Sequence, residues 1–271
     1  MVSPIVRKPA VAGQFYPRPR QALEKQIAGL VEEKAEKIDA IACILPHAGY
    51  TYSGRVAGQT VSSIKIKDSI ILLGPNHTGY GGDYSIMTEG SWETPLGQIL
   101  VDSPLAKEIL AGSELLKEDP LAHVYEHSLE VELPFLQYFK PDFKIVPITF
   151  MSENVEELNQ IGTAIAHSLE NRKENSLIVA SSDMTHYESQ TEAEFKDKEA
   201  IAAILQLDAD TLIKKIRELN ISMCGWAPVV AMLKAAKLLG AKNATLVKYE
   251  TSGSSTGDTE SVVGYAGVII Y

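Results

Sequence analysis

Residues 69–77 read SIILLGPNH, a short apolar run that stops at a glycine, a proline and a histidine. A run of this length, bounded by turn residues, is typical of a buried strand. Similar apolar runs occur along the chain, at 41–45, 144–148, 176–180, 244–249 and 262–270. Segments with helical periodicity separate most of them, and this alternation predicts a largely parallel sheet.

The helical segments are numerous enough to cover both faces of such a sheet. They are expected at 54–64, 104–111, 128–139, 155–170, 192–205, 209–219 and 227–239. Between 83 and 102, Trp92, Pro95 and Gly97 break up β-rich pieces and favour a hairpin over a crossover helix. We therefore predict an α/β fold, a three-layer α/β/α sandwich with a mostly parallel central sheet, in one domain spanning residues 1–271.

Composition narrows the classes of function. The chain carries 25 Lys and Arg against 35 Asp and Glu, a formal charge of −10, which disfavours nucleic acid and anionic lipid as partners. The N-terminus shows no apolar segment of the kind found in signal peptides or membrane anchors. Cys43 and Cys224 are too few for a disulfide framework. We expect a cytoplasmic protein with reduced thiols.

Reactive side chains follow several of the expected strands. His47 comes just after the run 41–45, His77 after 69–73, and Asp183 and His186 after 176–180. Ligands of open α/β sheets bind beyond the carboxyl ends of the strands, so these residues should gather at one edge. Cys224 lies just ahead of a helix, where the helix dipole favours a thiolate.

Two imidazoles and one thiolate predict a mononuclear transition-metal site at His47, His77 and Cys224 with positions left open for substrate or oxygen. Nitrogen and sulfur ligands favour Fe(II), copper or zinc over magnesium or calcium. Asp183 and His186 are assigned to proton transfer.

Further residues are expected around this site. Tyr50, His127 and Trp226 are expected to line the substrate pocket. For His123 and His127 two interpretations stay open: they shape the start of a helix, or they line the pocket or form a second metal site with the neighbouring acids.

Six segments carry a resemblance to a known family. They are RKPAVAGQFYP at 7–17, PHAGY at 46–50, GPNH at 74–77, EHSLE at 126–130, SSDMTHY at 181–187 and CGW at 224–226. Together they resemble the Memo family over nearly the whole chain. That family is similar in fold to class III extradiol dioxygenases of the LigB type, which are non-haem iron enzymes.

The resemblance implies specific roles. His47 and His77 match the two metal histidines of the dioxygenases, His186 matches the acid/base histidine, and Asp183 lies near the metal. Cys224 matches the position where the dioxygenases present a glutamate, which departs from their pattern. The resemblance also implies copper or iron redox chemistry, with radical-SAM and AMMECR1-like proteins as partners of prokaryotic members.

Three functions remain open at this stage. The first is a metal-dependent, dioxygenase-like oxidoreductase acting on an unknown small molecule. The second is a non-enzymatic module that binds a peptide, a phosphopeptide or a partner protein in the same crevice. The third is a hydrolase or transferase with Cys224 as nucleophile, His186 as base and Asp183 as orienting group.

Overall fold

The computed structural model describes residues 5–172 and 175–271. The strands are β1 (Val6–Arg7), β2 (Ala42–Leu45), β3 (Ser69–Pro75), β4 (Tyr84–Ile86), β5 (Ser91–Thr94), β6 (Gly97–Val101), β7 (Lys117–Glu118), β8 (Lys144–Phe150), β9 (Ser176–Ser181), β10 (His186–Glu188), β11 (Ala244–Thr251) and β12 (Val262–Ile270). The helices are α1 (Arg20–Ala28), α2 (Tyr50–Ser62), α3 (Ser103–Ala111), α4 (Leu121–Val124), α5 (Leu133–Phe139), α6 (Val155–Leu169), α7 (Gln190–Leu205), α8 (Ala209–Leu219), α9 (Trp226–Leu238) and α10 (Gly253–Thr256).

Within the described residues the strands join into one large mixed sheet, whose main path runs β1-β5-β6-β8-β3-β9-β2-β12-β10. The centre of this path is parallel, from β6 through β8, β3 and β9 to β2. Strand β12 then pairs antiparallel with β2, β11 and β10, and β4 pairs antiparallel with β8. The fold is therefore α/β, with a parallel centre and mixed flanks.

The expected hairpin between residues 83 and 102 is confirmed, because β5 and β6 pair antiparallel across a tight turn, with Thr94 opposite Gly97. Its first strand also pairs with the N-terminal β1 in parallel. The hairpin thus extends one side of the sheet and ties the start of the chain to it.

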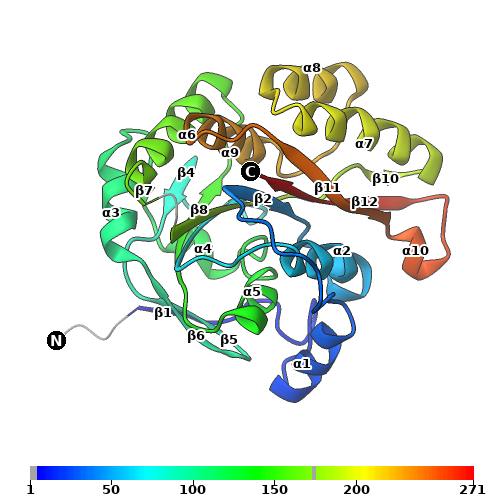
Figure 1. Ribbon diagram of the computed structural model, residues 1–271, viewed down its shortest axis with the longest axis horizontal. Coiled ribbons are helices and arrows are strands. Elements are labelled where there is room, and N and C mark those ends of the chain that lie inside the picture. The colour runs from blue at the N-terminus through cyan, green and yellow to red at the C-terminus, as the bar shows by residue number, and fades with distance from the viewer. Residues whose placement is uncertain (1–4, 173–174) are drawn as a thin grey trace.

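Helices pack on the central strands through apolar side chains. Helix α9 contacts β2, β3, β8 and β9, and α6 packs on α9, while α2 contacts β2, β11 and β12. The buried side chains of these elements form a continuous core. In Figure 1 the N-terminal α1 and the pair α7 and α8 lie at opposite sides of the molecule. No helix within residues 5–172 and 175–271 combines the length and apolar character that a membrane crossing requires.

Two helices differ clearly from their sequence-based boundaries, and one of them is α2, which was expected over 54–64 and begins already at Tyr50. The helix expected over 128–139 begins only at Leu133, and residues 126–132 form turns instead. The side chain of Glu126 accepts hydrogen bonds from the backbone N–H groups of His127 and Ser128. Pro134 lies in the first turn of α5, where its missing N–H costs no helical hydrogen bond, whereas a helix over 128–139 would place this proline in its interior, and this explains the later start.

Candidate metal centre

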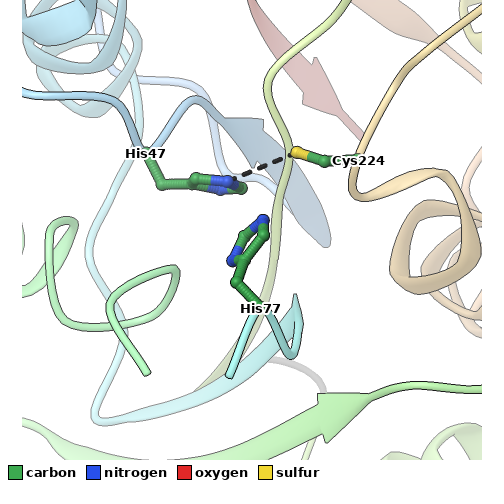
Figure 2. A group of neighbouring side chains, drawn as sticks. All are labelled: His47, His77 and Cys224. Carbon is green, nitrogen blue, oxygen red and sulfur yellow. Dashed lines mark hydrogen bonds between the residues drawn. The ribbon is translucent and has the colours of Figure 1, made fainter. Parts of the chain in front are cut away.

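Three side chains from distant parts of the chain converge at the carboxyl ends of the parallel strands. His47 follows β2, His77 follows β3, and Cys224 precedes α9. Their ligand atoms all lie within 4.8 Å of one another. Figure 2 shows the sulfur of Cys224 facing the His47 ring, with the His77 ring beside them, and 3.3 Å separates the sulfur from His47 Nε2.

His47 is buried, and its other ring nitrogen is fixed by a serine. Nδ1 lies 2.7 Å from Ser181 Oγ, and that hydroxyl also lies 2.7 Å from the carbonyl oxygen of Ser128. A carbonyl oxygen can only accept, so the Ser181 proton points to Ser128 and Ser181 must accept from His47 Nδ1–H. The remaining nitrogen, Nε2, then carries a lone pair toward Cys224. Burial, followed by the neighbouring histidines, lowers the pKa of His47 well below its usual value and keeps the ring neutral.

His77 is held by Glu126. The two oxygens of Glu126 accept from the backbone N–H of His77 and from its ring Nδ1, the latter at 3.0 Å. Burial alone would raise the pKa of Glu126, but the hydrogen bonds from His77 and Ser128 outweigh it and hold the pKa at about 2. An ionised carboxylate on Nδ1 leaves Nε2 of His77 as the free ligand atom.

Cys224 reaches the site because the next residue has no side chain. A Cβ on Gly225 would lie 2.1 Å from the carbonyl oxygen of Ser181, so only glycine lets α9 approach the end of β9 this closely. Burial, with the charge of Asp183 next, raises the pKa of the Cys224 thiol. Without a cation the sulfur is therefore protonated.

Asp183 and His186 are placed at the same edge. Asp183 is buried, and its Oδ1 accepts from the backbone N–H of His47 at 2.8 Å. Burial raises the pKa of Asp183 to about 6, against the opposing effect of this hydrogen bond. His186 Nδ1 faces two carbonyl oxygens, those of Met184 at 2.7 Å and Ser222 at 3.0 Å. Nδ1 must donate to them, so Nε2 is the basic nitrogen of His186.

These residues open onto a cavity of about 620 Å³. Its lining includes His47, His77, His127, Asp183, His186 and Cys224, as well as Gln14, Phe15, Ala48, Gly49, Tyr52, Tyr187, Ser222, Val263 and Tyr265. The structure thus brings together the three expected metal ligands, the two expected proton-transfer residues and His127.

Two other expected pocket residues lie elsewhere. Tyr50 is 1% exposed and donates its hydroxyl to the carbonyl of Val131. Trp226 lies at the start of α9 and donates its ring N–H to Glu153. Neither lines the cavity. Both follow a ligand loop directly in sequence, but their side chains turn into the protein.

Little in the sequence indicated which aromatic side chains line the cavity. Tyr187 follows His186 and takes a left-handed backbone, φ 59°, that holds its side chain 78% exposed at the cavity. Phe15 arrives from the N-terminal segment and packs edge-on against His127, with ring centroids 4.9 Å apart. Tyr265 comes from β12, far from every ligand in sequence.

His127 belongs to a second group of close ligand atoms, with His77 and Glu126. Glu126 Oε1 in that group already accepts from the backbone N–H groups of His127 and Ser128, at 2.8 Å each. Because the oxygens of Glu126 already accept hydrogen bonds, this side chain orients His77 and His127. His123, in contrast, is fully buried against Trp92 and lies away from the cavity.

Comparison with known proteins finds relatives of this chain. The sequence model described as Memo-like protein matches residues 7–269. A MEMO1 family protein of Methanosarcina mazei is 42% identical over 267 residues, which cover 98% of this chain and 99% of the relative. A MEMO1 family protein of Aquifex aeolicus is 43% identical over 266 residues, covering 97% and 98%.

A solved structure shares the fold. The crystal structure of JW3007 from Escherichia coli K12 covers 84% of this chain and 98% of its own, with a TM-score of 0.55. The two sequences are 15% identical, so the likeness shows a common fold and nothing of function.

Proposed function

Because this chain belongs to the Memo-like protein family, we propose that it binds one transition-metal ion through His47, His77 and Cys224 and performs redox or oxygen-dependent chemistry on a small molecule. The observation that carries the proposal is the convergence of two imidazole nitrogens and one sulfur within 4.8 Å. These atoms come from three separate loops at one edge of the sheet.

The donor set fits a reactive metal site. Ser181 and Glu126 occupy the Nδ1 atoms of His47 and His77, which leaves both Nε2 atoms for an ion. Two nitrogens and a sulfur suit Fe(II), copper or zinc, and three protein ligands leave coordination positions free. Such an ion supplies a Lewis acid and, for iron or copper, an electron-transfer centre.

The chain's own groups would handle protons and give the cavity an aromatic wall. His186 is held with Nε2 basic, so it can accept a proton from a substrate in the cavity. Asp183 holds the backbone of the His47 loop, and its raised pKa suits exchange of a proton near neutral pH. Phe15, Tyr187 and Tyr265 give the cavity an apolar wall.

The likeness in fold to JW3007 supports the architecture only. We propose on this basis that the packed helices form a layer on each face of the sheet. In the reducing cytosol that we propose as its setting, the two free cysteines stay unpaired and Cys224 remains available to an ion.

The test is metal content after anaerobic purification without chelators. We expect about one metal ion per wild-type chain and a strong loss of occupancy in Cys224→Ala, because the anionic ligand is gone. Cys43→Ala is the matched control, since Cys43 is buried in β2 and lies outside the cavity. Equal metal content in wild type and Cys224→Ala would overturn the proposal.

The contact between Cys224 and His47 also favours a second candidate, a Cys-His hydrolase or transferase in which His47 takes the place of the expected base His186. The raised pKa of the thiol argues against an activated nucleophile in the metal-free protein. Alkylation of Cys224 that proceeds at the same rate with and without added metal would favour this candidate.

The phosphopeptide alternative has less support. No Lys or Arg occurs among the described residues that line the cavity, so only a histidine could meet a phosphate there with a positive charge.

A further inference from the structure

Asp197 is a buried acid with no part in the metal centre described above. It lies in α7 and is fully buried, on the same helix face as the apolar Ala193, Ala200 and Ile204. Its carboxyl group fits against β12 because residue 264 is a glycine, and a Cβ on Gly264 would collide with Asp197 Oδ2. Removing a carboxyl group from water costs free energy, so its hydrogen-bond partners should show what it contributes.

The two carboxyl oxygens of Asp197 have different partners. Oδ1 accepts from the backbone N–H of Thr185 at 2.9 Å, and Oδ2 accepts from the Tyr249 hydroxyl at 2.8 Å. Thr185 is buried and lies between Asp183 and His186 in sequence. Asp197 therefore holds the backbone of the segment that carries both proposed proton-transfer residues.

The N–H that Asp197 binds belongs to the same peptide unit as a carbonyl that holds His186. This unit joins Met184 to Thr185, and its oxygen accepts from His186 Nδ1 at 2.7 Å. The N–H and the C=O of one planar amide are rigidly linked, so an acceptor on the N–H also fixes the direction of the C=O. A hydrogen bond to the N–H polarises the amide as well, which makes its oxygen a better acceptor.

The backbone groups on either side of this peptide unit have other partners. The Met184 N–H donates to the Gly264 carbonyl at 2.8 Å, and the Gly264 N–H donates to the Thr185 carbonyl at 2.9 Å. Gly264 in β12 thus holds the neighbouring peptide units, and Asp197 supplies the acceptor for the N–H of the unit between them.

We propose that Asp197 is a positioning residue for His186: it binds the peptide unit between Met184 and Thr185 and so holds the Met184 carbonyl against the ring. The Ser222 carbonyl, 3.0 Å from the same Nδ1, also accepts from it. Either carbonyl keeps the proton on Nδ1, so Asp197 determines where the ring lies and not which nitrogen carries the proton. The proposal deepens the proposed function, and it rests on that function only in giving the basic Nε2 a proton to accept.

Nitrogen-15 NMR of the histidine rings in the metal-free protein tests this role. A ring N–H that is held by an acceptor exchanges its proton with water more slowly than a free one. The wild type should therefore show slowly exchanging Nδ1–H signals from His186 and from His47. His47 is the internal control, because its Nδ1–H donates to Ser181.

Three variants separate the bond to Thr185 from the charge of Asp197 and from its bond to Tyr249. Asp197→Ala removes the acceptor, and we expect the His186 ring proton to exchange about tenfold faster while His47 stays unchanged. Asp197→Asn keeps a carbonyl oxygen for the Thr185 N–H, and Tyr249→Phe leaves Oδ1 in place. Both should stay within about threefold of the wild-type rate at His186.

An unchanged exchange rate at His186 in Asp197→Ala would overturn the proposal. A rise of equal size at His47 would overturn it too, because Asp197 would then support the fold in general. If Asp197→Ala does not fold, Asp197→Asn decides: its amide is a weaker acceptor than a carboxylate, so the signals of the Thr185 amide proton and the His186 ring proton should both move. Movement of the Thr185 signal alone would contradict the link through one peptide unit.

Failure of the proposed function can be told apart from failure of this proposal, because the exchange rates are measured without metal. A wild type that binds no metal but shows the expected rates at His186 and His47 would reject the proposed function and retain the role of Asp197.

Discussion

Glu126 is one side chain that orders two histidines of the site. Its oxygens accept from the backbone and ring of His77 and from the backbone of His127 and Ser128. The carboxylate fits because every neighbour is a donor. An amide in the same place would turn an NH2 group toward at least one N–H.

Glu126→Gln should therefore weaken both the fold and the site. We expect about 2 kcal/mol of lost stability from the mismatched donors and about tenfold weaker metal binding from the loosened His77 ring. Chemical denaturation and metal titration measure the two effects. Glu130→Gln is the matched control, because among the described residues this equally buried carboxylate hydrogen-bonds the N-terminal segment and no histidine, so metal affinity should change much less than in Glu126→Gln.

His123 gives the stability a dependence on pH. Burial, with the charge of Arg7 next, lowers the pKa of His123 to about 3. Between that value and the ordinary histidine pKa of about 6.5 the unfolded chain binds the extra proton, so the free energy of unfolding falls as the pH falls.

This effect should remove about 3 kcal/mol of stability between pH 7 and pH 4. Urea unfolding of the metal-free protein across this range should show a smaller loss in His123→Phe, which has nothing to protonate. Substitution of the exposed His167 by Gln serves as the control. A loss of equal size in wild type and His123→Phe would show that other groups cause it.

At the scale of elements, the junction of β9 and α9 decides where the sulfur lies. Gly225 lies directly before α9, where this helix comes close to the end of β9. A Cβ on Gly225 would collide with the backbone of Ser181 and the side chain of Ser182. The collision involves backbone, so one of the two elements must move to accept it.

Gly225→Ala should cost about 2 kcal/mol or more of stability through this overpacking. It should also lower metal affinity, because Cys224 moves with the helix start. Gly29→Ala is a suitable control, since its new Cβ would come no nearer than 3.5 Å to another atom. Thermal unfolding and metal titration would expose the contrast, and similar behaviour of the two variants would contradict the argument.

The longer strands and helices could be predicted from local patterns because their apolar runs and helical spacing are long enough to recognise. The short strands β1, β4, β7 and β10 and the helices α1, α4 and α10 were not predicted. The run 69–73 became the start of β3, and the histidines after β2 and β3 landed at one edge, as parallel strands require. The turns at 128–132 were missed because their apolar spacing is helical, although Pro134 marks the later helix start in the sequence. Their exact path depends on long-range partners such as Arg7, which the local sequence does not show.

At the scale of the whole molecule, the local sequence did not predict which strands pair with each other. Strand β12 joins β2 antiparallel and delivers Tyr265 to the cavity, although nothing near Tyr265 in the chain marks it as a pocket residue. Phe15 likewise depends on Glu130 holding the N-terminal segment. Tyr50 and Trp226 show the reverse case, where proximity in sequence to a ligand did not place a side chain in the cavity.

The separation of the ligands has a consequence for how the protein matures. His47 and Cys224 are 177 positions apart, and they meet only after β2, β3, β9 and α9 have assembled. A nascent chain that has emerged only as far as His77 carries two of the three candidate ligands and lacks Cys224, so a metal could occupy this site only after Cys224 has been made. Binding of the ion would then stabilise the folded chain by mass action, so the metal itself would favour protein that has been fully synthesised and folded.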